Sequence, residues 1–565
     1  WANDAPEKNR TDNSLSLDHV RAKCTLQAHV LPHAPQIGPI SISDRWDCRM
    51  SMHYSADETT AITHLKLKPQ YHADLRDWII HPAMADIACS MILTTEDNGS
   101  LPVGIDEITL HAPFSGDIIV CAERRHPGQA DFTFFDADSQ KLLLTIRGIR
   151  FSGDVNGKAA SAMPELLEID WLPGTVEMQP VPENTIMIAD GDFWPIPPAC
   201  QRVHPDMLGK DMLAKAQNVI LALQPGEDIA LRTARCLRDI LRSMRGRMRL
   251  VVAGSGAYQI DRDTIPASPD QSAAAGVAIA VAAEEPRLAL SFTDIAPADF
   301  IAHVGGELAA DPGRDPVSVY RNQVRYHRKL RPISGHDNLP QPNWPDHGVC
   351  VVTGGTGGFA IALADEMALG GKITLALLAR RGEDGLDAIA QSKLADLRAK
   401  GIKVSIHTCD VADKNALSDT LATIRNSLGP ITAIAHAAGL ADGGFLAVRD
   451  MDAFDAIMAA KIKGARHLDA LTLNDPVQAF VMFGSLTAIV GVPGQAAYSA
   501  ANAFLDGFAR YRRSQGRPAL TIDWCALADQ GMAARHNVPL QDGAAITPQQ
   551  APIFWRDAMC STAAQ

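Results

Sequence analysis

The feature that most constrains the fold is an alternation of apolar runs and amphipathic stretches between about residues 347 and 540. Six apolar, β-branched runs occur there: GVCVVTGG, ITLALLAR, KVSIHTCD, ITAIAHAAG, AFVMFGS and LTIDWCAL. The segments between them, such as NALSDTLATIRNSLG, repeat apolar residues at helical spacing and close on Gly or polar residues. Apolar strands joined by helices predict a parallel, doubly wound α/β sheet. We therefore expect a domain of this class over residues 345–565.

Two further regions precede this domain. Residues 164–335 show a weaker alternation, with strands expected at NTIMIAD, AQNVILAL, RLVVAGSG and LALSFTDI, and no glycine-rich phosphate turn after them. We interpret them as a Rossmann-like companion domain without a cofactor. Residues 1–155 instead predict antiparallel strands around one apolar helix, HPAMADIACSMILTT, which is an α+β arrangement. The proline-rich stretch GHDNLPQPNWPDHG marks the joint before the last domain.

Length and charge exclude several function classes. A chain of 565 residues is long enough for about three domains. The net charge of -13 argues against a duplex nucleic-acid binder, which needs a basic face. The ten cysteines are scattered singly, and neither a signal peptide nor a membrane span is visible, so we expect a cytoplasmic protein without a metal site. The chain starts on Trp without Met, as an excised piece of a longer protein would.

A glycine-rich turn follows the first strand of the last domain. Its sequence is TGGTGGFAIAL, and the residues in it that we expect to bind a dinucleotide are Gly354, Gly355, Thr356, Gly357 and Gly358. Glycines let the backbone turn sharply and approach a pyrophosphate, whose charge then meets N–H groups at the start of a helix. The usual last glycine is Ala360, which this motif tolerates. The strand before the turn and the helix after it favour a dinucleotide site over a flexible loop.

The ends of the next two strands predict which dinucleotide binds. Where NAD enzymes place a carboxylate, this chain has Arg380 and Arg381, whose guanidinium groups favour a 2'-phosphate. NADPH is therefore the expected cofactor, although a solvated charge pair on a loop is the alternative. Asp410 ends the third strand, followed by Val411, and its carboxylate is a candidate partner of the adenine amino group.

A Ser followed by a Tyr on a new helix is the arrangement with which nicotinamide-dependent reductases place a proton donor. Here these residues are Ser485 and Tyr498, but the position four residues after the Tyr holds Asn502 instead of the usual Lys. A Tyr with a pKa near 10 is a poor acid at neutral pH unless a cation lies close. Lys461 and Lys463, on the helix before the Ser strand, are the candidates for that cation.

These motifs resemble the ketoreductase of modular polyketide synthases and related multifunctional fatty acid synthases. In that family Lys, Ser, Tyr and Asn form a tetrad, and Lys461, Ser485, Tyr498 and Asn502 match it in order without gaps. The resemblance implies that Tyr498 donates a proton, Ser485 orients the substrate oxygen, Lys461 lowers the pKa of the tyrosine and Asn502 helps to hold the site. It also implies that residues 164–335 are the truncated structural subdomain that partners these ketoreductases.

The N-terminal region resembles the dehydratase of the same synthases. HPAMADIACS is similar to the HPxxxD motif of that family, which makes Asp86 a possible dehydratase carboxylate. Such dehydratases have two hot-dog halves, and the first half supplies a catalytic His in a motif that this sequence lacks. IGPI at residues 37–40 is similar to the start of the second half, and Ser90 stands where the family usually has Gln or His. Either the first half is missing here or the dehydratase is a remnant.

The resemblance implies a 3-oxoacyl substrate on the phosphopantetheine arm of an acyl carrier protein, with other synthase domains as partners and no nucleic acid or membrane. Pro493 favours B-type stereochemistry, and Val490 stands where A-type enzymes have Trp, whereas Ala441-Asp442-Gly443 departs from the Leu-Asp-Asp loop of B-type enzymes. The later motif DWCAL departs from the family's NWGpW. The alternatives are a catalytically silent structural module, a dehydratase–ketoreductase pair lacking one half, and a free-standing reductase of small metabolites.

Overall fold

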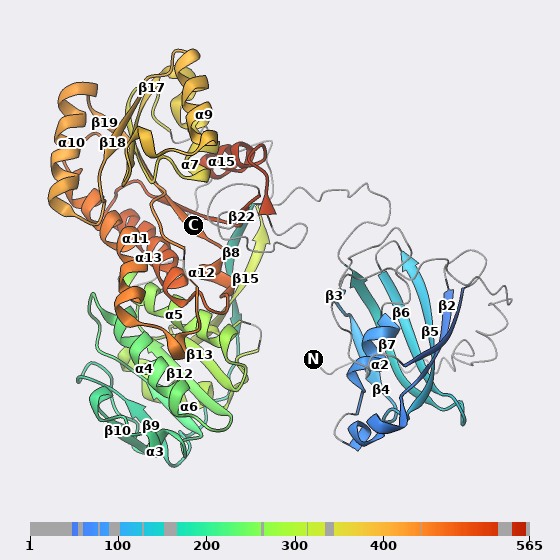
Figure 1. Cartoon of the computed structure of the whole chain (residues 1–565). Coiled ribbons are helices and arrows are strands. Elements are labelled where there is room, and N and C mark those ends of the chain that lie inside the picture. Colours follow the sequence, from blue (N-terminus) through green and yellow to red (C-terminus); the bar gives the residue numbers. More distant parts are fainter. Residues whose placement is uncertain are drawn as a thin grey trace. The chain divides into compact units, whose positions relative to one another are not determined.

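The computed structural model divides the chain into two compact units, Trp1–Met163 and Pro164–Gln565. It describes residues 48–54, 60–76, 79–89, 102–126, 129–151, 166–260, 265–313, 315–333, 344–441, 443–528 and 545–560. Within these ranges, every helix is too short or too polar to cross a membrane. The ribbon in Figure 1 labels the elements used below.

The first unit contains one antiparallel sheet with a helix against it. The sheet order is β1-β2-β5-β6-β7-β3, with β4 also paired to β7. Its core joins Met84 and Ala88 of the helix to Phe132 and Leu144 of the sheet. The elements are β1 (Arg49–Tyr54), β2 (Thr60–Lys66), η3 (Pro69–Arg76), α2 (Pro82–Cys89), β3 (Pro102–Gly104), β4 (Glu107–Leu110), β5 (Asp117–His126), β6 (Gln129–Asp136) and β7 (Leu142–Phe151). The predicted α+β architecture is confirmed.

The second unit begins with an eight-stranded sheet, which we call the structural sheet. Its order is β10-β9-β11-β12-β13-β14-β15-β8, and the strands from β10 to β14 are parallel. The first strand in the sequence pairs antiparallel with the last, so the chain enters and leaves this sheet at one edge. The strands are β8 (Leu167–Gly174), β9 (Thr185–Ile188), β10 (Cys200–Val203), β11 (Asn218–Leu221), β12 (Met248–Gly254), β13 (Leu288–Asp294), β14 (Val317–Arg321) and β15 (Val324–Pro332). The helices are α3 (Lys210–Leu213), α4 (Ile229–Ser243), α5 (Pro269–Glu284) and α6 (Pro297–Ala309), with η5 at Pro205–Met207.

The second sheet of this unit, the catalytic sheet, has six parallel strands in the order β18-β17-β16-β19-β20-β21. The strands are β16 (Gly348–Thr353), β17 (Ile373–Ala379), β18 (Val404–Thr408), β19 (Ile431–His436), β20 (Ala479–Ser485) and β21 (Leu520–Trp524), and a small ribbon joins β22 (Ala526–Leu527) to β23 (Ala545–Ile546). The helices are α7 (Gly358–Ala362), α8 (Ala364–Ala368), α9 (Ala388–Ala399), α10 (Lys414–Leu428), α11 (Met451–Leu471), α12 (Thr487–Val490), α13 (Ala496–Ser514) and α15 (Ala551–Cys560), with short η7 (Leu369–Gly371), η8 (Glu383–Gly385) and η9 (Leu446–Val448). All six predicted apolar runs form these strands, so the doubly wound prediction is confirmed.

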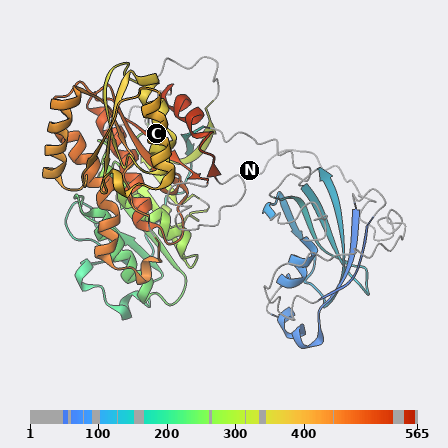
Figure 2. The ribbon, with the colours of Figure 1, turned by 45° about the horizontal axis from the view of Figure 1, so that its top comes forward.

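The two sheets of the second unit meet through helices. Figures 1 and 2 show α11, α12 and α13 on the side of the catalytic sheet that faces α4 and α5 of the structural sheet. Helix α5 is apolar around most of its circumference and is buried from Gln271 to Val281, as expected of a helix covered on all sides. At Gly276 an added Cβ would lie 2.6 Å from the carbonyl oxygen of Ser499, so only glycine lets α13 approach this closely.

Candidate active site

The glycine-rich turn after β16 has the shape of a dinucleotide cradle. Gly354 has a φ of +62°, which favours glycine, and an added Cβ there would lie 2.8 Å from the carbonyl oxygen of Ala437. A Cβ at Gly355 would lie 2.8 Å from Leu377 Cβ on the neighbouring strand. Thr356 and Gly357 then lead, partly exposed, into α7, which starts at Gly358. The turn therefore fits a pyrophosphate, which needs small residues and helix-start N–H groups.

The other predicted cofactor residues follow the neighbouring strands. Arg380 and Arg381 come directly after β17 and are exposed, and neither forms an ion pair with any residue that the structure describes. Exposed Asp410 follows β18, and its carboxylate accepts a hydrogen bond from Ala412 N at 2.9 Å. Val411 beside it is buried. These residues lie at the carboxyl ends of adjacent strands, next to the switch point between β16 and β19 where doubly wound sheets bind ligands.

The four residues predicted to form the tetrad converge from three elements. Ser485 ends β20, Lys461 lies on α11, and Tyr498 and Asn502 lie one turn apart on α13. The Asn502 Nδ2 atom donates a hydrogen bond to the carbonyl oxygen of Tyr498 at 2.8 Å. The Lys461 ammonium lies 5.9 Å from the centroid of the Tyr498 ring. The fold thus brings Lys461 together with three residues that lie 24 to 41 positions later in the sequence.

The structure distinguishes the two candidate lysines. Lys461 is only 3% exposed, and its Nζ donates to the carbonyl oxygen of Phe483 at 2.5 Å, two residues before Ser485. Lys463 is half exposed and lies beside Asp455 on the same helix. Burial lowers the pKa of Lys461 to about 8, against the charges of Asp523 and Asp506, which raise it. Lys461 is therefore the lysine that the fold directs into the site.

The phenol of Tyr498 lies beside two polar side chains of the predicted tetrad. Burial raises its pKa above the ordinary value, against hydrogen bonds with Asn502 and Ser485 that lower it. A buried phenol keeps its proton at neutral pH, as a proton donor must. The family resemblance implied a lowered pKa for Tyr498, but the structure gives a raised one, because burial outweighs the two hydrogen bonds.

A buried histidine that the sequence analysis did not single out supports this arrangement. His436 ends β19; its Nδ1 accepts a hydrogen bond from Thr353 Oγ1 at 2.7 Å, and its Nε2 donates to the carbonyl oxygen of Lys461 at 3.0 Å. Burial and the charge of Lys461 lower the pKa of His436 to about 3, so the ring stays neutral. His436 fixes α11, and with it Lys461, against the ends of two strands. Its place in AHAAG, at the end of an apolar strand, is the signal that would have indicated it.

Two carboxyl groups behind Lys461 were also missed. Asp506 is 4% exposed on α13, one turn beyond Asn502, and Asp523 lies on β21 opposite Gly484. Burial, followed by the charge of Asp523, raises the pKa of Asp506 well above its ordinary value. A buried ammonium beside two carboxyl groups that share a hydrogen bond is an arrangement often found in active sites. In the sequence, Asp523 is visible only as the first letter of DWCAL.

Comparison with known proteins identifies this arrangement. Residues 348–529 match a family model described as KR domain, and residues 48–154 match the polyketide synthase dehydratase N-terminal domain. A solved structure titled as A-type ketoreductases from a modular polyketide synthase has a TM-score of 0.60 and 27% identity, and covers 70% of this chain and 90% of that chain. Both matched regions are similar to domains of polyketide synthases. The second unit of this chain carries a ketoreductase, as predicted.

Sequence relatives place the ketoreductase in the same family. The pikromycin polyketide synthase component PikAIII of Streptomyces venezuelae is 34% identical over 280 residues, 49% of this chain and 18% of that protein. Erythronolide synthase EryA3 of Saccharopolyspora erythraea is 36% identical over 273 residues, 47% of this chain and 8% of that protein. The A1-type ketoreductase structure has a TM-score of 0.59 and 26% identity, over 70% of this chain and 90% of that one. The chain therefore spans less than a fifth of the length of these two relatives.

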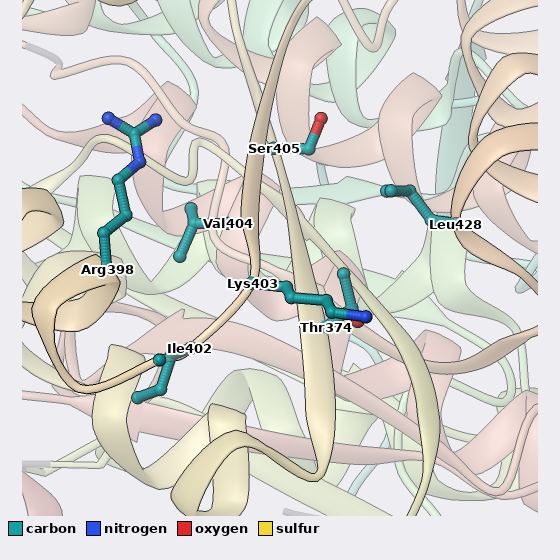
Figure 3. A pocket seen from close by; sticks show the side chains of 8 residues that line it. Thr374, Arg398, Ile402, Lys403, Val404, Ser405 and Leu428 are labelled. Carbon is teal, nitrogen blue, oxygen red and sulfur yellow. The ribbon is translucent and has the colours of Figure 1, made fainter.

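A pocket on the ketoreductase lies at the opposite edge of the catalytic sheet. Its volume is 420 Å³, and it is lined by Thr374, Arg398, Leu428 and residues 401–405. Figure 3 shows Arg398 of α9 and Leu428 at the end of α10 on opposite sides of the start of β18. Because it opens at the amino ends of the strands, this pocket is separate from the residues that we expect to bind cofactor and substrate.

In the dehydratase-like unit, the predicted dehydratase carboxylate, Asp86, lies on a helix. Asp86 lies in α2, one turn after His81, which is 1% exposed and lies with its Nε2 3.4 Å from Asp74 Oδ2. His81 thus has a partner in η3. Ser90 and residues 37–40 lie outside the described residues. The matching family model carries the description of the N-terminal dehydratase domain, so the assignment of this unit to the second hot-dog half stays a prediction.

Proposed function

We propose that residues 164–565 reduce a 3-oxoacyl thioester to the 3-hydroxyacyl thioester with NADPH, the substrate being held on the phosphopantetheine arm of an acyl carrier protein. The observation that carries this proposal is the convergence of Lys461, Ser485, Tyr498 and Asn502 beside the cradle formed by Gly354 and its neighbours. A reductase of this kind needs an acid within reach of the ketone oxygen and a cofactor beside the ketone carbon. The polyketide synthase relatives support carrier-bound substrates and neighbouring synthase domains as partners.

In this proposal each residue of the tetrad has one task. NADPH, when bound, supplies the hydride that reduces the carbonyl carbon. Tyr498 gives its phenol proton to the carbonyl oxygen, while the hydroxyl of Ser485 orients that oxygen by a hydrogen bond. The Lys461 ammonium stabilises the phenolate that remains, since it lies 5.9 Å from the ring centroid. Asn502 fixes the first turns of α13 through its bond to the backbone of Tyr498.

We further propose B-type stereochemistry, which gives the D-configured alcohol. Pro493 and the absence of Trp at residue 490 support it, and Val490 is 52% exposed at the end of α12. The similarity of the fold to A-type ketoreductase structures does not decide which face of the ketone is reduced, because both types would share the tetrad. Asp442 of the loop that distinguishes the types lies outside the described residues.

The test is NADPH oxidation by this polypeptide with a 3-oxoacyl thioester, followed by chiral analysis of the product. Turnover that yields the D-configured alcohol supports both parts of the proposal, and the opposite enantiomer would overturn the stereochemical part alone. If NADPH binds without turnover, the same assay is repeated with substrate loaded on a carrier protein. No turnover with the loaded carrier, or no binding of NADPH, would favour a catalytically silent structural module.

The preference for NADPH gives a separate prediction. Replacing Arg380 and Arg381 together with Ala is expected to lower kcat/KM for NADPH by about tenfold to hundredfold, because charged hydrogen bonds contribute about 1.5–3 kcal/mol. Activity with NADH, which lacks the 2'-phosphate, is expected to change little. The matched control is Lys403→Ala, an exposed basic residue at the opposite edge of the sheet. Equal losses with both cofactors would contradict the assignment of this pair to the 2'-phosphate.

A further inference from the structure

One side chain of the structural sheet's helices contacts two loops of the catalytic sheet. Glu284 is the last residue of α5 and is half-buried. Its Oε1 accepts a hydrogen bond from Leu446 N at 2.6 Å, and its Oε2 accepts one from Gly494 N at 3.2 Å. The two carboxylate oxygens thus hold two backbone segments that lie 48 positions apart, from residue 446 to residue 494. Bonds of backbone N–H groups to a charged acceptor are stronger than neutral ones.

Both segments border the tetrad. Gly494 lies two residues before α13 starts and four residues before Tyr498. Leu446 starts η9, which lies in the loop after β19. The same loop passes close to Lys461 at Gly439, where an added Cβ would lie 3.0 Å from Lys461 Cε. The loops also meet each other, because a Cβ at Gly494 would lie 3.4 Å from Gly444 N. Glu284 therefore sets the spacing of two loops that lead directly to the reacting groups.

A second contact holds one of these loops from the same side. Arg242, near the end of α4, donates a hydrogen bond from Nε to the carbonyl oxygen of Ala447 in η9. The helices of the structural sheet thus hold two adjacent residues of this loop: Glu284 accepts from the N–H of Leu446, and Arg242 donates to the carbonyl oxygen of Ala447. Apolar packing alone allows helices to slide, whereas two directional bonds fix the loop's position along α4 and α5.

We propose that Glu284 is a positioning residue for the ketoreductase, and that the structural subdomain acts on catalysis through its carboxylate. This inference rests on the proposed function. A carboxylate suits these two loops because Leu446 and Gly494 both offer backbone N–H donors, and a glutamine in its place has only one acceptor oxygen. Its amide nitrogen would face a donor, so one of the two loops would be released.

The experiment compares Glu284→Gln with Glu285→Gln in the full chain. Glu285 is the matched control. It is the next residue in the chain and carries the same carboxylate, but its carboxylate pairs with Arg287 at 2.7 Å on the surface. For Glu284→Gln we expect kcat to fall by about tenfold to hundredfold, as for a small displacement of reacting groups. We expect an unchanged KM for NADPH and an unchanged melting temperature, together with a larger share of the minor alcohol enantiomer. Glu285→Gln should match the wild type in all four measurements.

Glu284→Asp keeps the charge but shortens the side chain, and we expect a kcat between those of the wild type and Glu284→Gln. If the Gln variant does not fold, this variant, with a wild-type melting temperature, carries the same comparison. Wild-type turnover combined with equal kcat values for the Glu284 and Glu285 variants would overturn the inference and leave the proposed function intact. A fall in NADPH binding equal to the fall in kcat would overturn it too, since it would show a general structural role. If the wild type itself does not reduce the loaded carrier, the proposed function fails, and the inference fails with it.

Discussion

Replacing Tyr498 with Phe is expected to lower kcat by about 10²- to 10⁴-fold, the usual contribution of a positioned general acid. The substitution removes only the phenol oxygen, so the ring keeps its place near Lys461 and the helix keeps its packing. NADPH binding is expected to be unchanged, since the cradle at Gly354 lies on a different loop. Single-turnover reduction of a 3-oxoacyl thioester, measured beside a titration with NADPH, separates the two quantities.

Tyr511→Phe is the matched control for this prediction. Tyr511 lies on the same helix, three and a half turns further on, and its side chain is 36% exposed. It should retain wild-type turnover. Comparable activity of Tyr498→Phe and Tyr511→Phe would show that another group supplies the proton, and the tetrad would then lose its central member.

Replacing Lys461 with Met is expected to lower kcat by about 10²- to 10³-fold, the range for the loss of one preorganised charge at a reaction centre. Met fills a similar volume, so the effect reports the ammonium rather than a cavity. In the wild type, kcat is expected to fall as the pH rises through about 8, because burial lowers the pKa of Lys461 to that value and the neutral amine no longer stabilises the phenolate. The variant should lack this step in its pH profile.

Lys463→Met provides the control, since Lys463 lies two residues away on α11 with a half-exposed side chain beside Asp455. It is expected to keep both its turnover and the step near pH 8. A pH profile that moves in the Lys463 variant but not in the Lys461 variant would exchange the two assignments. Wild-type turnover in the Lys461 variant would remove the cation from the mechanism altogether.

The strands that carry the site were predictable because they are buried on both faces. Continuous apolar runs such as GVCVVTGG and AFVMFGS have few alternatives in a soluble chain, and each forms the expected strand. Ser485 and the glycine turn follow from their places at strand ends. Lys461 was predicted only as one of two lysines before the resemblance was considered, since its role depends on which face of α11 is buried. The exposed fraction of Lys461, only 3%, decides that question.

The parts that escaped prediction depend on contacts between distant segments. The pairing of β8 with β15 joins residues 151 to 165 positions apart, and the apolar pattern of neither strand predicts which strand it pairs with. His436 is a polar residue in an apolar run and acquires a role only when Thr353 and α11 lie beside it. The same holds for Glu284, which the sequence shows only as one of two adjacent glutamates. Local patterns predict elements, and tertiary contacts assign such side chains.

The close contact at Gly276 also has a bearing on how such modules are recombined. An added Cβ at Gly276 of α5 would clash with the backbone of α13 at Ser499. An added Cβ at Gly507 of α13 would likewise clash with Ser272 of α5, so the two helices fit only as a matched pair. A chimera that joins the structural sheet of one synthase to the catalytic sheet of another would keep this contact only if both parents have glycine at these two positions. A crossover between α5 and α13 would therefore disturb the helix that carries the tyrosine.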